Sequence, residues 1–160
     1  MGRIEEQVRA FFKQEQWSVS DAQLEPGTFL VQYRGENGQW TCSAVAIEAH
    51  EQFLFFCHFP FRCAPERVAA TSEFLHRAND GIHIGNFEFS ISDGEIRYKA
   101  SVSASDAPFE IESCRNVIFF ACLMMDMYFP GLNGLLNLGL SVDDALALCE
   151  PEHNASAQKG

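Results

Sequence analysis

The segment of residues 109–128 constrains the fold most, because its second half, VIFFACLMMDMYF, is apolar on nearly every side. A helix with apolar side chains all round is buried on more than one side. One side can pack against a sheet, whereas the other needs a further helix or another subunit to cover it. We expect Pro130 and Gly131 to end this helix. A short helix over 132–138 and a last one that begins after Ser141 are expected to follow.

Asp126 is the one charged residue in that apolar half of the helix. One interpretation makes it a buried functional acid. The other makes it a residue that faces outward, or that pairs with a capping or cationic group such as Arg77 or Arg115. An ionised carboxylate without a partner is costly to bury, so the second interpretation is favoured.

Turn signals and apolar spacing divide the rest of the chain into two helices and five strands. Residues 3–17 and 66–78 have helical spacing. Strands are expected over 28–34, 39–48, 52–59, 82–91 and 95–102, and Asn37-Gly38 and Ser92-Asp93-Gly94 are typical hairpin turns. Asp106 is expected to cap the long helix. The order α-β-β-β-α-β-β-α predicts an α+β fold, in which an antiparallel sheet of about five strands is packed by helices.

Length and charge limit the classes of function. A chain of 160 residues favours a single domain over residues 1–149, with 150–160 as a disordered tail. The net charge of -11 repels phosphate, which argues against binding of nucleic acid. The N-terminus does not have the pattern of a secretory signal, so we expect a cytoplasmic protein with six free cysteines. Residues 117–140 include Asp126 and Pro130, so we expect no insertion into a membrane.

The nearest approach to a metal or thiol site is Cys57-His58 together with Cys63. Zinc sites need closely spaced ligand pairs such as Cys-x-x-Cys, and here five residues separate Cys57 from Cys63. A buried, apolar Cys57 thiol is therefore favoured over a metal or redox role. The sequence shows no array of nucleophile, base and oxyanion donor. We accordingly expect no enzymatic activity, no catalytic residue, no metal and no cofactor.

Methionine and aromatic side chains of the long helix are candidate contacts with a protein partner, because such side chains adapt to different surfaces. The predicted contact residues are Phe119, Met124, Met127, Tyr128 and Phe129. The partner is expected to be a second copy in a homodimer or an unidentified polypeptide, and an ordinary core role for these residues stays open. The alternative function is a small-ligand binder or enzyme with a pocket between the sheet and the long helix, where Asp126 would meet His58 or Arg77.

Four short motifs, in this order and spacing, resemble the YbjN family, and its cyanobacterial members most. They are Arg77-Ala78-Asn79, the GNFE sequence of 85–88, the DGEIRYK sequence of 93–99 and the MDMYFPGL sequence of 125–132. The family is labelled a bacterial sensory transduction regulator. The resemblance implies a fold similar to that of class I type III secretion chaperones, which are small acidic homodimers. Those chaperones bind polypeptides through apolar patches, are not enzymes and carry no cofactor.

Overall fold

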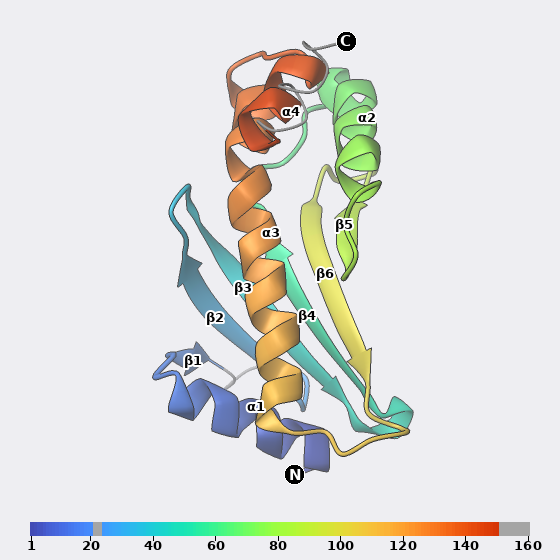
Figure 1. The fold of residues 1–160 in the computed structure, drawn as a ribbon. Coiled ribbons are helices and arrows are strands. Elements are labelled where there is room, and N and C mark those ends of the chain that lie inside the picture. The colour runs from blue at the N-terminus through green and yellow to red at the C-terminus, as the bar shows by residue number, and fades with distance from the viewer. Residues whose placement is uncertain (21–23, 151–160) are drawn as a thin grey trace.

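The protein forms a six-stranded antiparallel sheet with helices packed on one of its faces (Figure 1). The computed structural model describes residues 1–20 and 24–150. The strands are β1 (Val19–Ser20), β2 (Thr28–Arg34), β3 (Gln39–Ile47), β4 (Gln52–His58), β5 (Asn86–Phe89) and β6 (Ile96–Ser103). The helices are α1 (Arg3–Gln14), α2 (Val68–Asn79), α3 (Ile111–Asn137) and α4 (Val142–Cys149), with short 3-10 turns at Glu48–His50 and Pro65–Arg67. The strand order across the sheet is β1-β2-β3-β4-β6-β5.

Burial alternates along the central strands, which shows that the helices cover only one face of the sheet. In β3 and β4 every second residue is buried, and the residues between them are partly exposed. The register pairs Cys42 of β3 with Cys57 of β4, and Phe55 of β4 with Ala100 of β6. α3 crosses the covered face diagonally, with α1 at its N-terminal end and α4 at its C-terminal end, while α2 lies beside β5 (Figure 1). The α+β prediction is thus confirmed.

The sheet has one strand more than predicted. β1 is only two residues long, with Val19 opposite Val31, and a strand this short leaves no alternating pattern in the sequence. In contrast, the strand predicted over 82–91 is reduced to β5. Gly85 turns the chain into β5 with φ of 77°, and a side chain there would meet the carbonyl oxygen of Lys99. The predicted hairpin turn before β6 is present, and Asp93 Oδ1 accepts a hydrogen bond from Glu95 N at 3.0 Å.

Pro130 lies inside α3, so the prediction that Pro130 and Gly131 end the helix is wrong. Proline lacks the N–H that would bond to the carbonyl of Asp126, four residues earlier. The side chain of Asn37, in the β2–β3 loop, supplies that donor, with Nδ2 3.0 Å from the Asp126 carbonyl oxygen. The Asp126 carboxylate in turn accepts from the backbone N–H groups of Glu36 at 3.1 Å and Asn37 at 2.9 Å. Helix and loop therefore satisfy each other's free polar groups.

These contacts also settle the interpretation of Asp126. It caps a hairpin loop, as the capping interpretation allows, but neither predicted arginine is its partner. Arg77 pairs with Asp143 at 2.8 Å, and Arg115 pairs with Glu15 at 2.5 Å.

α3 is longer than predicted at its C-terminal end, where it absorbs the separate helix expected over 132–138. It begins at Ile111, and Glu110 takes the N-cap position, so Asp106 is not its cap. The predicted cap of the last helix is confirmed, since Ser141 Oγ accepts from Asp144 N at 3.1 Å. By length and composition α3 could cross a membrane, but 61% of its most apolar window is buried inside the protein. α3 is the core helix.

We predict that Asn37→Ala destabilises the protein by about 1 kcal/mol, because it leaves the Asp126 carbonyl without a donor. In a Pro130→Ala background the new backbone N–H can bond to that carbonyl, so the same substitution should cost less, with a coupling of roughly 0.5 kcal/mol or more. Urea unfolding of the wild type, both single variants and the double variant measures this coupling. Purely additive effects would contradict the account of how α3 continues through Pro130.

Candidate functional site

The predicted contact residues divide between the core and the surface. Met124, Tyr128 and Phe129 are buried, and only Met127 is well exposed, at 40%. The Phe129 ring stacks on Trp40 with centroids 5.9 Å apart. Phe119 is partly buried and packs edge-on against the Phe11 ring at 5.8 Å. Partner binding by these five residues stays a prediction, and the buried ones can act only as support beneath the exposed surface.

An apolar ridge on the outward side of α3 includes residues that sequence reasoning missed. Leu123 is 56% exposed and lies one turn before Met127, and Phe120 lies one turn before Leu123 and is partly exposed. We call Phe120, Leu123 and Met127 the outer ridge. At the end of α3 the side chains of Leu140 and Leu148 approach the position of Gly134, on the same side of the helix. The spacing of three and four residues between Phe120, Leu123 and Met127 was the signal in the sequence that could have identified the outer ridge.

A second candidate surface is the face of the sheet that no described helix covers, called here the open face. Three of its polar side chains lie in series across β3, β4 and the start of β6. Ser43 Oγ is 2.8 Å from His58 Nε2, and His58 Nδ1 is 3.1 Å from Glu95 Oε1. With Nδ1 protonated, His58 donates to Glu95 and accepts from the Ser43 hydroxyl. Sequence reasoning missed this series, because its members come from three separate segments.

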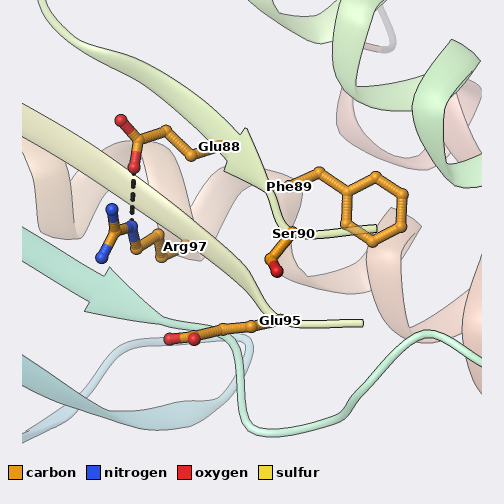
Figure 2. Close-up of a pocket in the computed structure, with 5 residues that line it drawn as sticks. All are labelled: Glu88, Phe89, Ser90, Glu95 and Arg97. Atoms are coloured by element: carbon orange, nitrogen blue, oxygen red, sulfur yellow. Dashed lines mark hydrogen bonds and ion pairs between the residues drawn. The ribbon is translucent and has the colours of Figure 1, made fainter. Parts of the chain in front are cut away.

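Beside this series lies an ion-paired pocket of about 460 Å³. Arg97 Nε donates to Glu88 Oε2 at 2.6 Å, and Lys99 Nζ lies 2.5 Å from Glu88 Oε1. Figure 2 shows the Glu88 and Arg97 side chains side by side, with Glu95 just before the start of β6 and the Phe89 ring directed away from them. The Arg97 guanidinium also lies over the ring of Phe56, 4.4 Å from its centroid. Each charge in the pocket thus has a partner already.

The serine, histidine and carboxylate have the connectivity of an acyl-transfer triad, but their surroundings do not suit that chemistry. Acyl transfer requires free N–H donors where the oxyanion develops. Ser43 lies in the middle of β3, which is hydrogen-bonded to β2 on one side and β4 on the other. Its neighbouring backbone N–H groups are therefore used in the sheet. Arg97, which pairs with His58 in the register of β4 and β6, is held by Glu88 and Phe56. The arrangement supports a rigid polar surface rather than a nucleophile.

The residues proposed for a pocket between sheet and helix do not meet. Asp126 holds the β2–β3 loop, His58 belongs to the open face, and Arg77 pairs with Asp143 near the start of α4. The structure therefore does not bring together the polar groups on which the alternative function depended.

The structure separates Cys57 from Cys63. Cys57 is fully buried, as predicted, and its sulfur lies 3.7 Å from that of Cys42. The sulfur of Cys122 completes a group of three within 4.8 Å of one another. Cys63 lies elsewhere, with its sulfur 3.2 Å from the Thr71 hydroxyl. The group of three sulfurs that includes Cys57 does not include Cys63, so the structure does not bring the two predicted thiols together in one cluster.

The fold class is α+β, with helices on one face of an antiparallel sheet. The chain belongs to the YbjN family, described as "Putative bacterial sensory transduction regulator", which matches residues 5–133. No curated protein matches the sequence. None of these findings supports the finer resemblance to cyanobacterial members of the family, which stays a prediction.

Solved structures with a similar fold include one from the same family. It is the crystal structure of YbjN from E. coli, described as "a putative transcription regulator", with a TM-score of 0.56 and 11% identity over 76% of this chain and 85% of that one. The ExsC–ExsE complex matches with a TM-score of 0.49 and 11% identity, over 80% of this chain and 94% of that chain. The HopA1–SchA chaperone–effector complex matches with a TM-score of 0.48 and 11% identity, over 74% and 86%. At this identity the likeness concerns the fold alone.

The ion pairs of Glu88 give the open face a testable dependence on pH. Burial alone would raise the pKa of Glu88, but hydrogen bonds and charges from Lys99 and Arg97 outweigh it and lower the pKa. The pKa of Glu88 is lower in the folded state than in the unfolded state, where it is about 4.3, so the ionised carboxylate stabilises the fold above that pH. This stabilisation is lost as the pH falls through the folded-state pKa. We therefore expect Glu88→Gln to flatten the acid-side loss of unfolding free energy below about pH 5. Urea unfolding from pH 3 to 7 measures the free energy of unfolding, and Glu6→Gln, at an exposed position, is the control. The same dependence of this free energy on pH in the wild type and both variants would contradict the stabilising ion pairs of Glu88.

Proposed function

We propose that the protein is a non-catalytic, cytoplasmic protein-binding module, chaperone-like or regulatory, that acts in bacterial signalling or stress responses as a homodimer. The outer ridge of α3 is the surface by which two copies pair. The module then holds a polypeptide partner on its remaining apolar surface. Membership of a family described as a sensory transduction regulator supports a regulatory role.

The exposed apolar ridge on a core helix is the observation that carries this proposal. Leu123 and Met127 are 56% and 40% exposed, although α3 packs against the sheet, α1 and α4. The outer ridge spans seven helical positions from Phe120 to Met127, or about 11 Å, and the side chain of Leu148 lies beside Gly134, seven positions further along α3. Large apolar side chains aligned along such a length are typical of protein–protein contact. Pairing of two ridges would supply the second cover that the all-round apolar helix requires.

The edges of the sheet favour contact through side chains rather than addition of a strand. Strand addition needs free N–H and C=O groups along an edge. At the β5 edge the Asn79 side chain accepts from Phe87 N at 2.7 Å and donates to Phe87 O at 3.1 Å. It thereby occupies the groups that an added strand would use, and β1 at the other edge is only two residues long. The apolar centre of the open face, formed by Leu30, Leu54 and Phe56, is the surface left for a polypeptide.

We predict that a double substitution, Leu123→Asp with Met127→Asp, dissociates the homodimer. Each copy would bring two carboxylates into an apolar contact, which should raise the dissociation constant by roughly 100-fold or more. Size-exclusion chromatography with light scattering, over a range of protein concentrations, measures the mass. Circular dichroism and thermal unfolding check that the variant is folded, which is expected because both side chains are exposed.

The control is Ile91→Asp, which places one such carboxylate on a residue 64% exposed in the β5–β6 turn, away from α3. This variant should keep the mass of the wild type. A wild type that is monomeric at all concentrations, or a double variant that assembles like the wild type, would overturn the proposal.

A further inference from the structure

Three cysteines from distant parts of the chain meet in the core under α3. Cys42 comes from β3, Cys57 from the neighbouring position of β4, and Cys122 from the inward side of α3. Each is 1% exposed or less, and the three sulfurs all lie within 4.8 Å of one another. We call them the sulfur cluster. Three sulfurs bonded to one atom at about 2.3 Å lie roughly 3.5–4 Å apart, so the cluster needs to contract by only about 1 Å.

A buried hydrogen-bond donor beside the cluster has no conventional partner. Trp40 Nε1 is the one buried side-chain nitrogen or oxygen among the described residues that lacks a hydrogen-bond partner. Trp40 lies two residues before Cys42 on the same, covered face of β3. An orphan donor at this place suits a sulfur that carries negative charge, as a metal-bound thiolate does.

From this geometry we propose that the sulfur cluster binds one trivalent metalloid ion that prefers thiolate ligands. Arsenite, which supplies As(III), is a form in which this ion reaches the cluster. The inference is independent of the proposed function, since the cluster lies inside the fold and the outer ridge on its surface.

The charge of the possible complexes selects the trivalent ion. Three thiolates leave a net charge of -2 with Cu(I) and -1 with a divalent ion such as Zn(II), but none with As(III). Net charge is costly in an apolar core. Asp126 lies on the next turn of α3 from Cys122, so its carboxylate would also repel an anionic complex. Zinc in addition prefers a fourth ligand, and the cluster offers three.

The binding reaction balances without an oxidant or reductant. Neutral As(OH)₃ meets three S–H groups, each sulfur forms a bond to arsenic, and each hydroxide leaves with one thiol proton as water. Three As–O bonds and three S–H bonds break, and three As–S bonds and three O–H bonds form. Arsenic stays trivalent, and its lone pair takes the place of a fourth ligand. Each species that enters or leaves the core is uncharged.

The test is arsenite added to the reduced, full-length protein, followed by thermal unfolding and by mass spectrometry under native conditions. We expect one arsenic per chain, with loss of three hydrogens, and a rise in Tm, because the ion binds the folded state. X-ray absorption should show three sulfur neighbours around arsenic. An ion that instead binds thiols of the unfolded chain would lower the Tm, and that outcome would overturn the proposal.

Two variants on α3 separate the sulfur cluster from other thiols. Cys122→Ala should lose the stoichiometric arsenic and the rise in Tm. Cys114→Ala removes an equally buried thiol of the same helix, outside the cluster, and should keep both. Retention of arsenic by Cys122→Ala would refute the site. Stabilisation by Zn(II) but not by arsenite would refute the choice of ion, and neither result would bear on the homodimer.

Discussion

The packing of α3 across the covered face of the sheet is the interaction on which the rest of the structure depends. Ile118, Met125 and Leu132 recur every seven residues along the helix and are fully buried in the core. Burial of such side chains stabilises a fold by about 1.5–3 kcal/mol each. α3 crosses the sheet diagonally, and α1 and α4 pack against its two ends (Figure 1). What they leave uncovered, in the middle, is the outer ridge.

The sequence predicted the fold well wherever one local pattern controls one element. The α+β class, the hairpin turns and the central strands follow from periodicity and turn residues. β1 could not be predicted, since two residues carry no period. Pro130 misled for a different reason. The rule that proline ends a helix assumes that the freed carbonyl finds no donor, and here Asn37, far away in sequence, supplies one.

The candidate sites were harder to predict than the fold, because each one depends on contacts between segments. Met127 was predicted as a contact residue from its chemistry, but which methionines and aromatics face outward depends on how α1 and α4 pack. Leu123 was missed for that reason, and Phe129 was included although it stacks on Trp40. Cys57 was correctly predicted to be buried. Its partners, Cys42 and Cys122, could be identified only once the register of β3 and β4 and the position of α3 were known.

Charge distribution explains how so acidic a chain can present a surface for self-association. A net charge of -11 would make two copies repel each other if the charges lay at their contact. Between Asn116 and Asn137, Asp126 is the one Asp, Glu, Lys or Arg residue of α3. Two backbone N–H groups of the β2–β3 loop hold its carboxylate. The one acid in the apolar helix is thus turned toward its own chain, which leaves the outer ridge free of charge. The same loop that carries the helix through Pro130 therefore also keeps the proposed contact surface apolar.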